Sequence, residues 1–303
     1  MRNIHFIINP AGNGGAGLRV WETFKNAWAV PIAAEHVTFT TRSGHARELA
    51  GSFAECGLIV VAGGDGTIGE VISGIMGLPE PRPKLGIIPC GTGNDIARNA
   101  GLLNLDDAIA ALQDADARSF DLIRIDRETN SGLETRHAFL FANAGFSAIP
   151  MMKPWMKRLL GATGAYYLST LLQVLVYHPP KMEVSVDGKA FSGELFLVIA
   201  GNAEYAGGGS MRIAPGARTD DGQLNISIIQ SIPKRKLITQ LFASIANGTH
   251  INEPEVSYFT GKKICVNSDP NVPLDLDGEL FGTTPSTFSV CPNAIQILCK
   301  RTN

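Results

Sequence analysis

The chain has 303 residues, of which 45% are hydrophobic and 18% are charged, and its formal net charge at pH 7 is −2. A chain of this length has room for two domains, or for one large domain with a substantial core. Because 26 basic residues nearly balance 28 acidic ones, no excess of positive charge indicates a nucleic-acid-binding protein. No stretch approaches about 18 consecutive apolar residues, so a membrane-spanning helix is not expected.

The five cysteines are odd in number and widely spaced, and none forms a CxxC pair. We therefore expect buried, reduced thiols rather than disulfides or a cysteine metal site. The opening stretch MRNIHFIINP is too short an apolar run for a secretory signal and lacks a cleavage site. These features predict a cytoplasmic protein.

The first third of the chain alternates strand-like and helix-like patterns. Apolar runs typical of buried strands occupy residues 4–8, 35–40, 58–63 and 84–89. Segments with helical spacing follow them at residues 18–28, 44–56, 67–77 and 94–102. Continuous apolar strands that alternate with helices predict a parallel sheet covered on both faces. Ligands of such sheets bind beyond the carboxyl ends of the strands, where the glycine clusters of this region fall.

The pattern changes after about residue 120. Alternating runs typical of strands occupy residues 120–126, 136–145, 181–188, 193–202, 223–230, 262–268 and 286–290, while residues 161–177 and 234–248 have helical spacing. Many strands joined by turn residues predict an antiparallel sandwich or barrel. We therefore expect an α/β nucleotide-binding domain over residues 1–122 and a β-rich lipid and metal domain over residues 123–303. About the last 10 residues are expected to pack back on the first domain.

The glycine loop after the first strand allows several interpretations. GNGGAG at Gly12 to Gly17 matches GxGxxG, with Glu35 near the position of a ribose-binding acid. Asn9-Pro10-Ala11 separates strand from glycine, however, whereas the dinucleotide fingerprint needs an immediate turn. Leu18-Arg19 replaces the Lys-Ser/Thr of a P-loop, which excludes that class. NAD binding and a plain flexible turn stay open, and we favour a nucleotide-contacting loop of another kind.

Two further glycine loops, GGDGT at 63–67 and PCGTGND at 89–95, each separate an apolar run from a helix. Each loop would present unpaired N–H groups and the positive end of a helix dipole to one crevice. Since consecutive strands of such sheets are often neighbours, the loops are expected to lie side by side. Alternatively, Asp65 and Asp95 act only as N-caps, each worth about 1 kcal/mol.

The segment PLDLDGELFG at 273–282 concentrates acidic residues. If it forms one strand, Asp275, Asp277 and Glu279 lie on one face. Such a face is either exposed and acidic or bound to a cation. Upstream, Asp220 and Asp221 in GARTDDGQLNI are either part of a hairpin turn or further cation ligands.

Together, VVAGGDGTIGEV, LGIIPCGTGNDIAR and the late DGE resemble the diacylglycerol kinase catalytic-domain family. That family includes sphingosine and ceramide kinases and bacterial soluble lipid kinases, and it is distantly similar to NAD kinases. The resemblance extends from INPAGNGGAG through TTRSGHA to PSTFSVCPNAIQILC, nearly the whole chain. In one departure, Gly69 stands where the family usually has Asn, while Glu70 is retained.

The resemblance implies an ATP- and Mg²⁺-dependent kinase with a cleft between its domains. The implied nucleotide-binding residues are Asn9, Thr40, Gly63, Gly64, Asp65, Gly66, Thr67, Ile68, Gly69, Gly91, Thr92 and Asp95. The implied metal ligands are the Arg218 carbonyl, the Asp221 carboxylate and the Gln223 carbonyl. Asp65 and Asp95 resemble acids that reach this ion through water. Glu279 ranks first as catalytic base, Asp277 is a close competitor, and Asp65 is a third candidate.

The expected substrate is a lipid hydroxyl, most simply that of diacylglycerol, which would give phosphatidic acid. The alternatives are a sphingoid base, another glycerol lipid or NAD as the acceptor, a non-catalytic lipid-binding protein, and a dinucleotide-dependent oxidoreductase. Residues 150–160 are expected to form an exposed lipid-facing loop, and the leucines of residues 165–177 to lie in the core. PKRK at 233–236 is expected to be a solvated basic turn. Peripheral membrane contact is expected, and a homodimer is possible.

Overall fold

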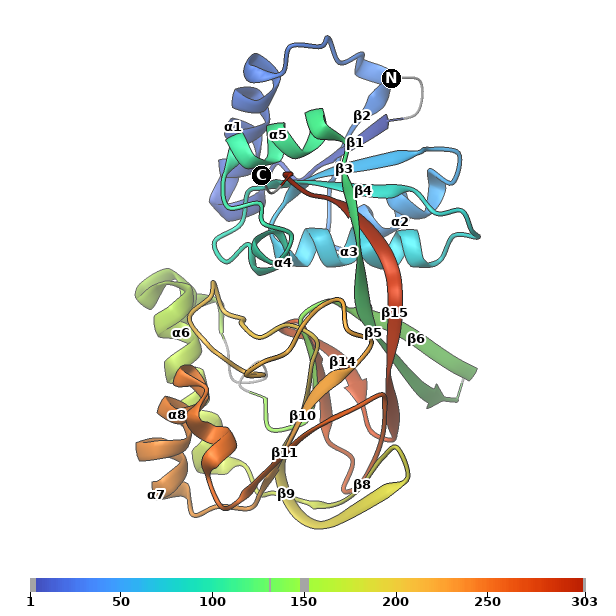
Figure 1. The fold of residues 1–303 in the computed structure, drawn as a ribbon. Coiled ribbons are helices and arrows are strands. Elements are labelled where there is room, and N and C mark those ends of the chain that lie inside the picture. Colours follow the sequence, from blue (N-terminus) through green and yellow to red (C-terminus); the bar gives the residue numbers. More distant parts are fainter. Residues whose placement is uncertain (1–3, 131, 148–152, 302–303) are drawn as a thin grey trace.

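The computed structural model describes residues 4–130, 132–147 and 153–301, and it consists of two lobes joined by two long strands (Figure 1). In the α/β lobe, four parallel strands lie side by side in the order β4-β3-β1-β2. They are β1 (Ile4–Ile8), β2 (Val37–Phe39), β3 (Leu58–Gly63) and β4 (Lys84–Pro89). The helices are α1 (Gly12–Ala27), η1 (Ala34–His36), α2 (His45–Ser52), α3 (Asp65–Met76), α4 (Asp95–Asn99) and α5 (Leu105–Asp114).

The sheet of the α/β lobe has an apolar core on each face. Successive strand residues alternate between the faces: Val60 packs with Trp21 and Phe24 of α1, and Val61 packs with Ile72 of α3. This two-sided burial explains why the strands are continuously apolar. The predicted parallel sheet is confirmed.

The second lobe is built mainly from antiparallel strands around a core of its own. Its strands are β6 (Gly132–Ala138), β7 (Phe141–Gly145), β8 (Lys181–Val186), β9 (Lys189–Gly201), β10 (Leu224–Gln230), β11 (Val256–Gly261), β12 (Lys263–Asp269), β13 (Pro273–Leu276) and β14 (Glu279–Thr283). Its helical segments are α6 (Pro154–Val176), α7 (Lys234–Lys236), η3 (Leu237–Leu241), α8 (Phe242–Asn247) and η4 (Thr249–Asn252). The helices α6, α7 and α8 gather on one side of the lobe (Figure 1). The predicted β-rich second domain is confirmed.

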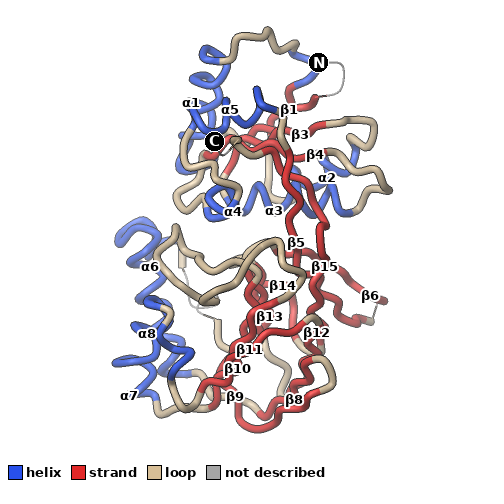
Figure 2. Tube along the Cα trace, viewed as in Figure 1, coloured by secondary structure: helices blue, strands red, loops and turns tan. Residues whose placement is uncertain are grey.

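Two strands, β5 (Ala117–Thr129) and β15 (Ser286–Leu298), run through both lobes as one antiparallel pair (Figure 2). Their pairing extends from Asp126↔Thr287 to Ala117↔Leu298, with one irregularity between Cys291 and Ile295. The end of β15 also pairs with β4, at Ile297↔Leu85. The strands of both lobes therefore form one continuous sheet, and the boundary placed at residue 122 falls inside β5.

Two segments that the sequence predicts as single strands are each divided into two strands. PLDLDGELFG forms β13 and β14, joined by a tight turn in which Asp277 and Gly278 have φ values of 50° and 87°. This is the Asp-Gly hairpin geometry, so the three acids do not share one face, and that prediction is wrong. Residues 136–145 likewise divide into β6 and β7, because the backbone between them bonds to Asp277 instead of continuing a ladder.

The region expected to contact lipid also differs from prediction. Residues 150–152 lie outside the described residues, and from Pro154 the chain is helical rather than a loop. Leu171, Leu172 and Leu175, expected in the core, are 42%, 36% and 53% exposed. Of the cysteines, Cys265 is exposed, so the prediction of buried thiols fails there. Among the described residues, no helix is both long and apolar enough to cross a bilayer.

Candidate functional site

The loops after β3 and β4 lie against each other beyond the carboxyl ends of the strands. The two strands pair directly, with Gly63 opposite Pro89. A Cβ at Gly64 would lie 2.9 Å from the Gly91 Cα, and one at Gly91 would lie 2.6 Å from the Gly64 Cα. The loops therefore approach as closely as glycine allows, and their predicted neighbourhood is confirmed.

The first glycine loop joins the same cluster. The Asn9 side-chain amide donates to the Thr67 hydroxyl over 2.8 Å, and the Thr92 hydroxyl donates to the Asn13 side chain over 3.2 Å. Gly17 packs directly on the Asn9 carbonyl, where a Cβ has no room. Thr40 follows β2, and its N–H donates to the Ile8 carbonyl at 2.8 Å. The structure thus brings Asn9, Thr67 and Thr92 together around the paired glycine loops. The side chain of Ile68, which the resemblance assigned to the same nucleotide, is buried in the core of the lobe.

Neither Asp65 nor Asp95 caps its own helix, although each is the first residue of one. Asp65 accepts a hydrogen bond from the Ile96 N–H of α4 at 2.9 Å. Asp95 accepts from the Gly208 and Gly209 N–H groups, both at 2.8 Å. Burial raises the pKa of Asp95, and the nearby negative charge of Asp65 adds to this rise, against the lowering effect of the two N–H donors. These acids connect loops that are distant in sequence, and Asp95 connects the two lobes.

Glu279 reaches from the second lobe to the GGDGT loop. It begins β14, and a Cβ at Gly66 would lie 3.2 Å from its Oε1 atom. The carboxylate lines a cavity of about 160 Å³ between the lobes. The residues that line this cavity are Ser43, Gly44, Arg47, Asp65, Gly66, Gly69, Glu70, Ser73, Arg136, His137, Leu276, Asp277, Glu279, Leu280 and Phe281. Desolvation raises the pKa of Glu279, Glu70 raises it further, and Arg136 opposes the shift.

Asp277 lines the same cavity, but its carboxylate is occupied. It accepts from the N–H groups of Phe139, Leu140 and Phe141 at 2.7, 2.9 and 2.9 Å. Burial raises the pKa of Asp277 to about 7, although these three donors lower it. Asp277 therefore anchors the β13–β14 hairpin to the break between β6 and β7. Among the described residues, no backbone N–H group donates to Glu279, so its carboxylate is not occupied in this way.

Gly69 and Glu70 of α3, which follow the GGDGT motif, have different surroundings. Glu70 accepts from the Gly44 and Ala46 N–H groups at 2.7 and 3.1 Å, so it holds the beginning of α2. A Cβ at Gly69 would have no atom within 4 Å. The space that an Asn side chain would fill is therefore open to the cavity.

Arg136 is a functional candidate that no motif in the sequence indicates. Its guanidinium lies 5.1 Å from the centroid of the Phe281 ring, near which Arg127 also lies, at 5.2 Å. Arg127 pairs with Glu134, whereas Arg136 forms no ion pair within the described part of the chain. An isolated Arg in an alternating strand belongs to no motif, so only the fold reveals that it faces the cleft.

The expected metal ligands lie in a turn outside this cavity. The Asp221 carboxylate accepts from the Gln223 N–H at 3.0 Å, and Arg218 pairs with Asp220 at 3.2 Å. One carboxylate and two carbonyls of a short turn are hard oxygen donors, which suit a Mg²⁺ ion that keeps several waters. Within the described ranges, no group of three or more His, Cys, Asp or Glu side chains is arranged to hold a metal.

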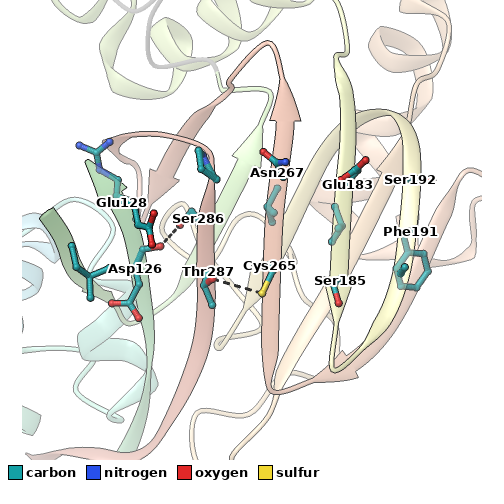
Figure 3. A pocket seen from close by; sticks show the side chains of 16 residues that line it. Asp126, Glu128, Glu183, Ser185, Phe191, Ser192, Cys265, Asn267, Ser286 and Thr287 are labelled. Carbon is teal, nitrogen blue, oxygen red and sulfur yellow. Dashed lines mark hydrogen bonds between the residues drawn. The ribbon is translucent and has the colours of Figure 1, made fainter. Parts of the chain in front are cut away.

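A larger cavity than the one beside Glu279 lies elsewhere and contains none of these motifs. It is an open groove of about 760 Å³ on the outer face of the second lobe (Figure 3). Short side chains such as Ser185, Cys265 and Thr287 form its floor across neighbouring strands, with Glu183 and Phe191 beside them (Figure 3). Size alone therefore does not locate the functional site.

Comparisons with known proteins agree with this arrangement. Residues 3–125 match the family model "Diacylglycerol kinase catalytic domain", and residues 142–299 match "YegS C-terminal NAD kinase beta sandwich-like domain". A diacylglycerol kinase of Bacillus subtilis (strain 168) is 32% identical over 82% of this chain and 80% of its own. One of Mycobacterium tuberculosis (strain H37Rv) is 32% identical over 80% and 77%. A crystal structure of a diacylglycerol kinase from Bacillus anthracis superposes with a TM-score of 0.71 at 25% identity, covering 98% and 96% of the two chains.

The two-lobed fold and the paired glycine motifs define a phosphotransferase with an alcohol group as acceptor. Within that class, the chain belongs to the diacylglycerol kinase catalytic-domain family.

Proposed function

We propose that this protein is an ATP- and Mg²⁺-dependent lipid kinase that phosphorylates a lipid hydroxyl, most simply that of diacylglycerol, to give phosphatidic acid. The observation that carries the proposal is the approach of the Glu279 carboxylate to Gly66 at the start of α3. A proton acceptor from one lobe thereby meets the phosphate-binding loop of the other. Relatives named diacylglycerol kinase support the choice of substrate.

The glycine loops would hold the phosphates of ATP. Backbone N–H groups at the start of α3, next to Gly64 and Gly91, lie where the helix dipole favours negative charge. The guanidinium of Arg136 lines the same cavity and is available to a phosphate oxygen. The backbone N–H groups and Arg136 together would stabilise the negative charge of the phosphates without the lysine of a P-loop.

Glu279 would accept the proton of the lipid hydroxyl as its oxygen attacks the γ-phosphorus. A carboxylate with a raised pKa is a better proton acceptor than an ordinary glutamate. Asp277 would hold the hairpin that carries Glu279, since its oxygens are occupied by backbone N–H groups. Asp65, which also lines the cavity, would be the second candidate for the proton acceptor.

For the magnesium ion we retain the Arg218 and Gln223 carbonyls and the Asp221 carboxylate as proposed ligands. When bound, Mg²⁺ supplies positive charge that offsets phosphate and carboxylate charge. Asp65 and Asp95 each bind backbone N–H groups, and their remaining lone pairs are available to water.

The substrate would be reached at a membrane surface. On α6, Trp155 is 54% and Leu159 74% exposed, and Leu175 is exposed further along the same helix. The exposed cations Arg158 and Arg235 lie on this helical side of the lobe. Apolar side chains interspersed with cations are typical of a peripheral contact with anionic lipid.

A lipid panel incubated with radiolabelled ATP, with and without magnesium, tests the proposal. We expect label in phosphatidic acid, dependent on magnesium and lost in Glu279→Gln. Label only in a sphingoid base, another glycerol lipid or NAD would reassign the substrate. A protein that binds lipid vesicles without ATP turnover, or that quenches NADH fluorescence, would contradict the kinase assignment.

A further inference from the structure

A second cavity, of about 510 Å³, lies where the α/β lobe meets the strands that run into the second lobe. The end of α3 and the segment before β4 form one wall, and β5, β6 and β15 form the others. The lining residues are Met76, Glu80, Arg82, Arg124, Thr135, His137, Cys291, Pro292, Asn293 and Ala294. Only His137 also lines the cavity that contains Glu279.

Two arginines from different parts of the fold face this cavity. The Arg82 Nε donates to the Leu78 carbonyl at 3.1 Å, and its Nη1 pairs with Glu80 at 2.5 Å. The Arg124 Nε bonds to Asp126 at 2.9 Å. Each guanidinium is held in place by these bonds, yet the Arg82 Nη2 and both Nη atoms of Arg124 have no partner within the described part of the chain. Donors held in this way suit an anion that accepts several hydrogen bonds.

The positive charges of Arg124 and Arg82 both reach His137, which also lines this cavity. Burial, and then the charges of Arg124 and Arg82, lower the pKa of His137 to about 4, and only Asp126 opposes them. The same two arginines also lower the pKa of Cys291, which burial raises. Glu80 is 68% exposed at the side chain, so solvent screens much of its charge.

We propose that this cavity binds a small soluble phosphate monoester between Arg82 and Arg124. A phosphate group matches the guanidinium donors, and Thr135 and Asn293 offer polar contacts to an organic portion. The volume exceeds that of a phosphate ion alone. The cavity adjoins β6 and β15, on the other side of the molecule from α6 (Figure 1), so a soluble ligand is favoured over a lipid headgroup. Because Arg82 belongs to the α/β lobe and Arg124 to a crossing strand, a bound anion would couple the lobes.

Nuclear magnetic resonance of the histidine imidazoles tests this site without any kinase assay. Inorganic phosphate and glycerol 3-phosphate are titrated separately into the full chain, with an excess of a non-hydrolysable ATP analogue to occupy the glycine loops. The His137 signal is assigned by its absence in His137→Gln. We expect this signal to move saturably, with a dissociation constant raised at least about tenfold in Arg82→Gln or Arg124→Gln.

Arg212→Gln is the matched control, because Arg212 pairs with Glu204 and is 42% exposed, against 44% for Arg124. Arg212→Gln should bind inorganic phosphate and glycerol 3-phosphate with the same dissociation constants as the unmodified protein. Arg124→Lys keeps the positive charge but loses the planar set of N–H donors of the guanidinium. This variant should therefore also bind phosphate weakly, and it tests the site even if Arg124→Gln unfolds. Unchanged affinity in both Arg124 variants, or a stationary His137 signal, would overturn the proposal. Movement only with vesicles that contain phosphatidic acid would overturn the assignment to a soluble ligand.

Discussion

At the scale of single residues, the structure separates carboxylates that the sequence could not distinguish. Asp277 and Glu279 are two positions apart, but the turn between β13 and β14 directs them to different partners. Asp277 bonds to three backbone N–H groups, whereas Glu279 faces Gly66. Their substitution should therefore have different consequences.

We expect Glu279→Gln to lower kcat by a factor on the order of 10²–10⁴, the usual cost of losing a general base. Its melting temperature should change little, since no backbone group of the described residues bonds to this carboxylate. Asp277→Asn should lower the free energy of unfolding by about 1–3 kcal/mol, because the amide NH₂ would meet a backbone donor. Lipid phosphorylation assays and denaturant titration at pH 8 measure the two effects. An Asp277→Asn variant of unchanged stability would contradict the anchoring role of Asp277, and a fully active Glu279→Gln would contradict the role of Glu279 as the base.

The raised pKa of Glu279 predicts a pH dependence of the reaction. The base must be deprotonated to accept a proton, so activity is lost as the pH falls through its folded-state pKa. Since burial and Glu70 raise that pKa, the acidic limb of kcat/KM should lie above the ordinary range of a glutamate. Arg136 opposes the rise, and Arg136→Met should move the limb to still higher pH. An acidic limb at or below the ordinary value would count against Glu279 as the base.

At the scale of elements, the site depends on the close packing of two loops. Asp65 ties the GGDGT loop to α4, and Gly64 touches Gly91, so neither loop can shift alone. The hydrogen bonds of Asp95 extend the connection to Gly208 and Gly209 in the second lobe. The phosphate-binding surface is therefore shaped by contacts between turns rather than by one turn.

Gly91→Ala should weaken this packing. Its Cβ would lie 2.6 Å from the Gly64 Cα and 2.8 Å from the Asn94 side-chain oxygen. We expect a loss of about 1–3 kcal/mol in the free energy of unfolding and a higher KM for ATP. Gly69→Ala is the matched control, since nothing lies within 4 Å and alanine favours a helix interior by roughly 0.5–1 kcal/mol. Equal melting temperatures for the two variants would refute the argument.

At the scale of the whole molecule, β5 and β15 make the lobes one folding unit. Each strand contributes to both lobes, and the end of β15 pairs with both β5 and β4. Phe120 and Leu122 of β5 belong to the core beneath α3, whereas Ile123 and Ile125 belong to the core of the second lobe. A destabilising substitution at either end of these strands should therefore lower the stability of both lobes.

We expect a single calorimetric unfolding transition. Ile297→Ala, at a fully buried position beside Leu85, should lower the stability of that one transition by about 2–5 kcal/mol. Leu133→Ala on β6, where the side chain is 64% exposed, is the control and should change the stability by less than about 0.5 kcal/mol. Two resolved transitions, with only one shifted by Ile297→Ala, would show that the lobes unfold independently.

Local patterns in the sequence were enough to predict the parallel sheet, the β-rich second lobe and the neighbouring glycine loops. Strand and helix periodicity and the covalent order of strands encode these features directly. Local patterns gave the wrong structure where a contact with a distant segment overrode them. Asp277 bonds to the Phe139 N–H across 138 positions of the chain, which breaks one expected strand and turns another into a hairpin.

Other features depended on the tertiary structure alone. Arg136 lines the cleft because β6 lies next to α3 and Phe281 of β14 lies beside its guanidinium. The leucines of α6 are exposed because that helix lies on the outside of the lobe. Residue spacing specifies which side chains share a face of one element. It does not specify which element will pack on that face, because that choice depends on contacts between segments far apart in the chain.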